Sequence, residues 1–332
     1  MLTSIYSTES PALLNQLVNT PEMQRLSDVG MHCGCEYSSA SLCTSTRKRY
    51  TRLMHSIGVA RIVWNFTKDT TQAVAGLLHD ISTPVFAHTI DFMNNDHIAQ
   101  ESTEDKTLFF IENSKEITLL LKSAGIHLDA VCDYHKYPIA DNDTPMLSAD
   151  RLEYTLGNAY NVYNEPLSLI STLYDDLTVS KNEHGVDELC FRSFDTAKRF
   201  TEIALRNSHF YVSDTDRYLM QYLAEIVRHA LSVGALTPDD LYTTESEVIE
   251  KLREHVETAA VWTKYTGISN VATSEDKPSL EHCFSVNGKK RYIDVLVQTE
   301  DGAKRISEVD SYIKADIESF LSLDFSKWLY AV

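Results

Sequence analysis

The segment from Arg49 to Phe66, RYTRLMHSIGVARIVWNF, contains apolar residues that recur every three or four positions. This spacing places them on one face of a helix, because an α-helix has about 3.6 residues per turn. The apolar positions are Leu53, Met54, Ile57, Ala60, Val63 and Trp64. The segment therefore predicts a buried helix, and His55 lies within it.

Helical patterns extend over most of the remaining sequence, which has only 11 glycines and 8 prolines in 332 residues. Scarcity of these two residues favours long helices over many short strands. Within residues 10–30 we predict a helix, a turn and a second helix that begins at Pro21 and is capped by Thr20. Further predicted helices cover residues 71–80, 86–92, 101–123, 145–160, 195–208, 213–233, 238–263 and 310–322, and residues 32–45 are expected to form a loop.

Two segments, 177–192 and 282–308, predict strands. The first contains the turn His184-Gly185, and the second contains Asn287-Gly288 and Asp301-Gly302, which are typical hairpin turns. We therefore expect a mostly α fold. Residues 1–165 would form a helical metal-binding core, and residues 166–332 a mainly helical C-terminal part with a small β-hairpin or meander region, packed on the core as one unit.

The formal net charge of -18 disfavours duplex nucleic acid and anionic membranes as main partners, because phosphate neutralisation needs a basic face. No run approaches the roughly 18 apolar residues of a membrane span. The N-terminal stretch MLTSIYSTESPALL lacks the pattern of a secretory signal, so we expect a cytoplasmic protein. The six cysteines form no CxxC pair, which favours reduced, partly buried thiols over a zinc site.

One basic cluster interrupts this acidic composition. It consists of Arg47, Lys48 and Arg49, followed by Arg52, and it lies just before His55. Such a cluster attracts a small anion such as a nucleotide phosphate, or it forms a solvated helix start. Both interpretations stay open for all of these residues except Arg52.

Four metal-competent residues are spread over the first half of the chain: His55, the neighbours His79 and Asp80, and Asp150. Two imidazoles and two carboxylates can hold one divalent transition metal and leave positions open for water and substrate. An open metal site lowers the pKa of bound water and produces a nucleophile at neutral pH, which indicates a hydrolase. Mn, Fe, Ni, Co and Zn all suit this donor set.

Taken singly, a histidine in an apolar helix is more often a core residue than a ligand. The apolar run Gly76-Leu77-Leu78 directly before His79 and Asp80 favours a metal ligand over a core residue. Burying an ionisable pair there costs several kcal/mol unless a metal or another partner compensates. Neighbouring helical side chains diverge by about 100°, so both reach one metal most easily where the helix ends, shortly before Pro84.

Four segments of the chain resemble the HD-domain superfamily of metal-dependent phosphohydrolases, and within it the deoxynucleoside-triphosphate triphosphohydrolase (dGTPase-like) branch. They span roughly residues 20–160 in the order of that family. The segments are PEMQRL from Pro21, RLMHSIGV from Arg52, GLLHD from Gly76 continuing to Pro84, Phe86 and His88, and ADRLEY from Ala149. Weaker similarity continues through AKRF from Ala197 and RYID from Arg291.

The resemblance implies that His55, His79, Asp80 and Asp150 bind the metal. It also implies that Arg52 and Tyr154 face a nucleotide. Arg52 precedes His55 by about one helical turn, a spacing that suits a phosphate bridging to the metal. Tyr154 follows Asp150 by about one turn and suits contact with a sugar.

The sequence also departs from the pattern of the triphosphohydrolases. After the HD pair, Thr83 replaces the usual middle histidine, and downstream Gln100 replaces the histidine of a His-Glu pair. The resemblance leaves Glu101 as a candidate for acid-base catalysis. It places His88 and Asp91 near the family's site as further catalytic candidates, and for His88 the alternative is a structural hydrogen bond. His97 is expected to be exposed to solvent.

These features predict a phosphohydrolase with one HD-type His/His/Asp/Asp metal site, acting on a nucleotide or a related small phosphate ester or anhydride. The alternative is a catalytically weak metal- or nucleotide-binding protein with a regulatory role, which the missing histidines favour. The intact set of four ligands favours the enzyme. A homo-oligomer is expected by analogy with related enzymes.

Overall fold

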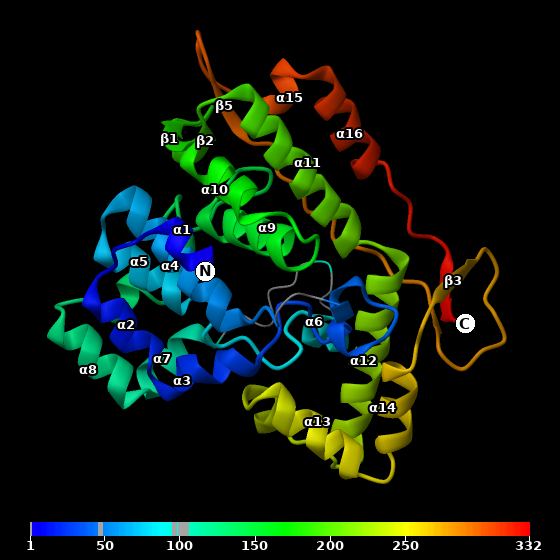
Figure 1. The fold of residues 1–332 in the computed structure, drawn as a ribbon. Coiled ribbons are helices and arrows are strands. Elements are labelled where there is room, and N and C mark those ends of the chain that lie inside the picture. The colour runs from blue at the N-terminus through cyan, green and yellow to red at the C-terminus, as the bar shows by residue number, and fades with distance from the viewer. Residues whose placement is uncertain (1, 46–48, 95–97, 99–105) are drawn as a thin grey trace.

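The computed structural model describes residues 2–45, 49–94, 98 and 106–332. Helix α4, Arg52–Thr67, packs against α1, Leu2–Tyr6, against α5, Thr70–Leu78, and against α9, Ala149–Asn161 (Figure 1). The Thr51 side chain caps α4 by accepting a hydrogen bond from the Met54 amide. Helix α4 thus lies beside its neighbour in sequence, α5, and beside the distant α9, and the candidate metal ligands lie on α4, on α9 and directly after α5.

The remaining helices cover most of the rest of the described chain. The α-helices are α2 Ala12–Val18, α3 Pro21–Arg25, α6 Thr89–Met93, α7 Thr107–Asn113, α8 Lys115–Ser123, α10 Leu167–Asp175, α11 Phe194–Tyr211, α12 Asp214–Ser232, α13 Glu245–Glu254, α14 Ala259–Thr266, α15 Ile306–Val309 and α16 Ser311–Leu321. Short 3-10 turns are η1 Leu26–Asp28, η2 Cys35–Tyr37, η3 Leu42–Ser45, η4 Leu128–Ala130, η5 Tyr134–Lys136 and η6 Pro238–Tyr242.

Two small sheets complete the part of the fold that the structure describes. The four-stranded sheet has the order β1-β2-β5-β6 and the three-stranded sheet the order β3-β7-β4. The pairs β1-β2 and β5-β6 are antiparallel hairpins, whereas β2 and β5 are parallel. The strands are β1 Leu177–Lys181, β2 Asp187–Phe191, β3 Val271–Ser274, β4 Cys283–Phe284, β5 Leu296–Thr299, β6 Gly302–Arg305 and β7 Trp328–Ala331. The predicted fold class, mostly α with a small β region, is confirmed.

Some predicted boundaries are wrong. The helix expected at 101–123 is two helices within the described residues, because the Ser114 side chain caps α8 at the amide of Ile117. The helix expected at 238–263 is divided into η6, α13 and α14, with Thr244 capping α13. Asn287-Gly288 makes no hairpin, because β4 pairs with the distant C-terminal strand β7. Helix α10 was not predicted.

The helix that carries Asp150 begins later than expected. The sequence predicts its start at Pro145, but α9 begins at Ala149, and the Ser148 side chain accepts a hydrogen bond from the Arg151 amide. The Thr144-Pro145 peptide bond is cis. The Pro145 carbonyl accepts a hydrogen bond from the Asp294 amide at 2.9 Å. Asp150 lies in the first turn of α9, whereas a start at Pro145 would place it in the second turn.

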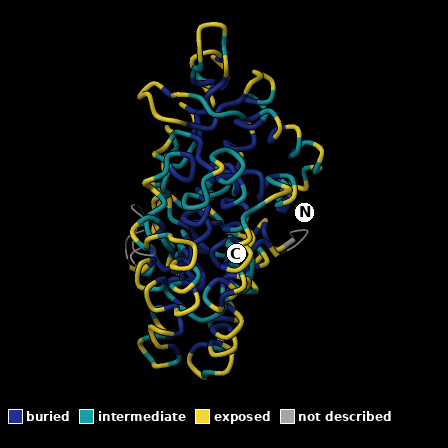
Figure 2. Tube along the Cα trace, turned by 90° about the vertical axis from the view of Figure 1, so that its left-hand side faces the viewer, coloured by how far each residue is buried: buried dark blue, intermediate teal, exposed yellow. Residues whose placement is uncertain are grey.

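Two hydrophobic clusters form the interior, and Figure 2 shows the buried trace running through the middle of the molecule. One cluster joins the N-terminal helices to α9, α10, α11 and α16. The other joins α6 to α12, α13, α14 and β7. Each draws residues from both sides of position 165, and the domain boundary expected there stays a prediction.

All six cysteines are free, and five of them are buried, as expected for reduced thiols. The segment 32–45, expected to be a loop, contains η2 and η3 and is largely buried. Thr20 precedes α3 as predicted, but its hydroxyl donates to the Leu17 carbonyl and does not cap the helix. None of the described helices combines the length and the apolar character that a membrane crossing requires.

Candidate metal centre

The predicted ligands converge at the meeting point of α4, α5 and α9. His55 lies on α4, His79 directly follows the last residue of α5, and Asp80 comes next. One ligand atom from each of these three residues lies within 4.8 Å of the other two. Asp150 completes the group, because its Oδ1 lies 2.9 Å from His55 Nε2 and 3.7 Å from His79 Nε2. The sequence prediction thus selects four residues that the fold brings together.

Hydrogen bonds to Nδ1 orient the imidazoles of His55 and His79 so that Nε2 of each ring faces the other candidate ligands. His79 Nδ1 lies 2.8 Å from the Gly76 carbonyl, which can only accept, so Nδ1 carries the proton and Nε2 points to Asp80 and Asp150. His55 Nδ1 lies 2.6 Å from Glu153 Oε2. Metal-binding histidines commonly donate their second N–H to a carboxylate or a backbone carbonyl in this way.

Glu153, which supports His55, is almost fully buried. Its carboxylate accepts hydrogen bonds from the hydroxyls of Tyr50 and Tyr6 as well as from His55. Gly58 makes room for it, because a Cβ at that position would lie 2.5 Å from Glu153 Cγ. The buried carboxylate therefore sets the orientation of His55 from the side facing away from the cluster.

Asp80 is held by two further residues. Arg52 Nη1 lies 3.2 Å and 3.1 Å from its two carboxylate oxygens, and Thr83 Oγ1 donates to Oδ1 at 2.7 Å. Burial disfavours ionised Asp80, but the charges of Arg52, His79 and His55 outweigh it and hold the pKa of Asp80 well below its ordinary value. Thr83, where the triphosphohydrolase pattern has a histidine, thus secures a candidate ligand.

The charges of the group suit a divalent cation. Burial disfavours charged His55, but the hydrogen bonds to Asp150 and Glu153 outweigh it and raise the pKa of His55 to about 10, so a metal bound at Nε2 would displace a proton from that nitrogen. Burial also opposes ionisation of Asp150, but His55 lowers the pKa of Asp150 to about 2. Two ionised aspartates therefore lie beside imidazoles whose Nε2 atoms face them. Nitrogen and oxygen donors of this kind bind transition metals, so the residues fit the group that the sequence predicts.

A cavity of about 690 Å³ opens over the metal centre. Arg52 and the four candidate ligands line it, together with residues from α6, α11 and α12. Tyr154 lies on the same wall and packs edge to face against Tyr211, with ring centroids 6.1 Å apart. Burial raises the pKa of Tyr154 to about 12, so its hydroxyl stays protonated at neutral pH.

His88 also lines this cavity, and its Nδ1 lies 2.9 Å from Asp91 Oδ2. Asp91 is fully buried, so it orients His88 without reaching the cavity itself. Burial lowers the pKa of His88 despite this hydrogen bond. Of the predicted catalytic residues, His88 lines the cavity and Asp91 contacts it from the buried side. Glu101, like Gln100 and His97, lies outside the described residues.

The expected basic cluster is only partly described. Arg47 and Lys48 lie outside the described residues, and Arg49 forms ion pairs with Asp28 and Glu245. Arg52 pairs with Asp80 and lines the cavity, and its Nε has no hydrogen-bond partner in the described part of the chain. Contact between Arg52 and a nucleotide stays a prediction.

Several residues at the site were not singled out from the sequence. Glu153 lies within the quoted ADRLEY segment, one turn after Asp150, and that spacing is the signal that could have identified it. His135 pairs with Asp141 through Nδ1 at 2.7 Å, and both line the cavity. Tyr134 packs on the ring of His79 with centroids 4.8 Å apart. The DYHKYP segment that contains Tyr134 and His135 carries no recognisable spacing.

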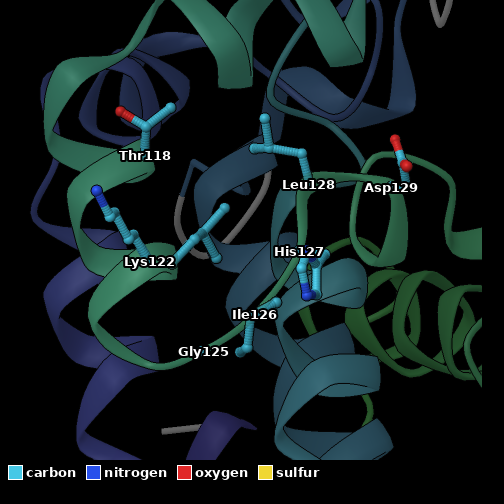
Figure 3. Close-up of a pocket in the computed structure, with 8 residues that line it drawn as sticks. Thr118, Lys122, Gly125, Ile126, His127, Leu128 and Asp129 are labelled. Atoms are coloured by element: carbon cyan, nitrogen blue, oxygen red, sulfur yellow. The ribbon is translucent and has the colours of Figure 1, made fainter.

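A second, shallow cavity of about 470 Å³ lies between α8 and η4 (Figure 3). Thr118, Lys122, His127 and Asp129 are among the residues that line it. It shares no residue with the cavity over the metal centre. His127 is exposed there, which makes it a useful comparison for the histidines of the centre.

Two known proteins are similar to this chain in sequence over most of its length. No family model matches the chain. The chain is 26% identical over 307 residues to an uncharacterised protein, YdhJ, from Bacillus subtilis, covering 91% of this chain and 89% of that protein. It is 26% identical over 292 residues to the metal-dependent phosphohydrolase cns2 from Cordyceps militaris, covering 83% and 75%.

Two crystal structures share the fold. A hypothetical protein from Aquifex aeolicus superposes with a TM-score of 0.67 at 19% identity, covering 97% of this chain and 93% of that chain. A phosphohydrolase from Bacteroides thetaiotaomicron superposes with a TM-score of 0.65 at 16% identity, covering 97% and 96%. The similarity extends over nearly the whole chain, including the C-terminal half that the sequence motifs barely reach.

Proposed function

We propose that this chain is a metal-dependent phosphohydrolase with an HD-type centre formed by His55, His79, Asp80 and Asp150. The observation that carries the proposal is the convergence of these four side chains with both Nε2 atoms directed at the carboxylates. The Cordyceps relative, whose name is that of a metal-dependent phosphohydrolase, and the Bacteroides phosphohydrolase with the same fold support it.

We assign the residues around the centre separate roles in hydrolysis. A divalent metal bound there would polarise a phosphoryl oxygen and lower the pKa of a bound water. Glu153 and Gly76 hold the imidazoles in position. Arg52 holds Asp80 and lies where it can share its charge with a phosphate. His88, oriented by Asp91, is placed on the cavity to donate a proton to the leaving group.

We propose a nucleotide or a similar small phosphate ester or anhydride as the substrate. The cavity volume of about 690 Å³ lies in the usual range of small-molecule sites. Tyr154 and Tyr211 give it an aromatic wall that suits a nucleoside. The triphosphohydrolase branch, a homo-oligomeric assembly and a cytoplasmic location belong to the same proposal. A regulatory protein that binds the metal or the nucleotide without turnover is the second candidate, which Thr83 and Gln100 favour.

Phosphate release by the purified protein tests the proposed function. We expect hydrolysis of at least one member of a panel of nucleoside mono-, di- and triphosphates, stimulated by Mn, Co or Ni over a metal-free sample. Tripolyphosphate from deoxynucleoside triphosphates would assign the triphosphohydrolase reaction, whereas orthophosphate from monophosphates would assign a nucleotidase. Metal binding without turnover of any phosphate ester would favour the regulatory candidate.

His88 gives a second test of the proposed chemistry. We expect His88→Gln to lower kcat by roughly 10²–10⁴-fold with little change in KM, because the proton donor is lost while the binding surfaces remain. The pH profile should change as well, since the protonated fraction of His88 falls as the pH rises through its lowered pKa. His127→Gln, which alters an exposed histidine of the other cavity, is the matched control. Equal rates in the two variants would exclude His88 as the donor.

A further inference from the structure

Within the described part of the chain, one arginine of the cavity over the metal centre has no partner that neutralises its charge. Four arginines of the described ranges line the cavity. Arg52 is paired with Asp80, and Arg151 donates to the Met146 carbonyl at 2.8 Å and lies near Asp141. Arg217 is bound to Asp214 and to the carbonyl of Val212. Among the described residues, Arg291 forms no hydrogen bond or ion pair.

Arg291 is near the groups that the proposed chemistry uses. Its positive charge acts electrostatically on His88, Tyr154 and Tyr211, and all three line the same cavity. The side chain is half-buried, so an anion bound to it is partly shielded from solvent. The chain as a whole has a net charge of -18. A positive charge on the cavity wall that no described side chain neutralises is therefore a local site that attracts an anion.

The backbone that carries Arg291 is held firmly by the rest of the fold. Ile293 and Val295, two and four residues further on, are buried in the larger hydrophobic cluster. Between them, the Asp294 amide donates to the Pro145 carbonyl, and the Asp294 carbonyl accepts from Arg305 Nη1 at 2.9 Å. The segment is thereby tied to the loop before α9, the helix of Asp150 and Tyr154. The C-terminal half thus completes a site whose metal ligands all come from the N-terminal half.

We propose that Arg291 binds the anionic group of the substrate, so that the cavity recognises phosphate through the C-terminal half of the chain as well as through the metal centre. This inference rests on the proposed function for the identity of the substrate, but anion binding by Arg291 does not require turnover. The guanidinium suits a phosphate because its planar fork donates two parallel hydrogen bonds to two oxygens. The ligand is a phosphate monoester or a polyphosphate. The metal centre would neutralise part of its negative charge, and Arg291 would bind the part that remains.

Calorimetric titration of inorganic pyrophosphate into the full-length, metal-stripped protein tests this inference. We expect Arg291→Gln to weaken binding by about tenfold or more, since a charge-assisted hydrogen bond is lost. Arg291→Lys should retain part of the affinity, because it keeps the charge and loses the fork. Lys290→Gln is the matched control, since it removes the neighbouring positive charge, which contacts the Leu321 carbonyl and does not line the cavity.

The outcomes separate this inference from the proposed function. Equal pyrophosphate affinity in wild type and Arg291→Gln overturns the inference, even if the enzyme is active. An equal loss in Arg291→Gln and Lys290→Gln also overturns it, because the effect is then one of net charge. A loss confined to Arg291→Gln in a protein that hydrolyses no phosphate ester would retain the anion site and reject the phosphohydrolase. Melting curves of each variant identify any loss of folding.

Discussion

Asp80→Asn is expected to abolish both metal binding and hydrolysis. The substitution preserves the shape of the side chain but removes the charge of a candidate ligand that contacts Arg52, Thr83 and His79. Residues that only support a ligand contribute roughly 10–100-fold to metal affinity, and loss of a ligand itself should exceed that. Metal content after dialysis and the rate of phosphate release measure the two effects.

The interpretation of this variant requires a control for folding. Removing one partner of a buried ion pair costs about 3–5 kcal/mol, because Arg52 is left without its counter-charge. The free energy of unfolding should therefore be measured without metal in both proteins. Asp143→Asn makes the same chemical change at an exposed residue of the same cavity. If Asp80→Asn retained metal and activity at the level of Asp143→Asn, the proposed centre would be wrong.

Glu153→Ala is expected to weaken the centre without touching the metal. His55 would lose the acceptor of its Nδ1 proton, and the hydroxyls of Tyr50 and Tyr6 would lose theirs. We expect metal affinity to fall by roughly 10–100-fold. Stability should fall by about 3 kcal/mol or more, since buried partners are left unsatisfied. Metal titration and urea unfolding measure these changes.

Tyr50→Phe separates the two consequences of the Glu153 substitution. It removes one donor to the carboxylate and leaves the hydrogen bond between His55 and Glu153 in place. We expect a loss of stability of about 1.5–3 kcal/mol, typical of a hydrogen bond to a charged group, with a smaller loss of metal affinity than in Glu153→Ala. Equal metal affinity in Glu153→Ala and wild type would show that Glu153 has a purely structural role.

The helices that carry the ligands could be predicted because their apolar residues follow the period of a helix. His55 belongs to such a pattern, and the apolar run before His79 made a buried ionisable pair conspicuous. The start of α9 was mistaken because a proline after a threonine is a common local helix signal, whereas here Pro145 accepts a bond from the distant Asp294. Local propensity does not contain such contacts.

The break at Ser114 has a local cause that the pattern concealed. The apolar residues of α7 and α8 continue through it without a change of period, but the serine side chain caps the second helix. The hairpin predicted at Asn287-Gly288 is absent because of a contact between segments that are distant in sequence. Its β4 neighbour pairs with β7, which lies more than forty positions away in the chain.

The sequence by itself determined the helical class of this protein, since periodicity is a local property, and its resemblance to a known family singled out the four candidate metal ligands. Tertiary structure alone decided which side chains surround them. Glu153 meets His55 across 98 positions of sequence, and Arg291 reaches the cavity from the other half of the chain. Charges and hydrogen bonds act through space over a few ångströms, so their partners are set by how the helices pack.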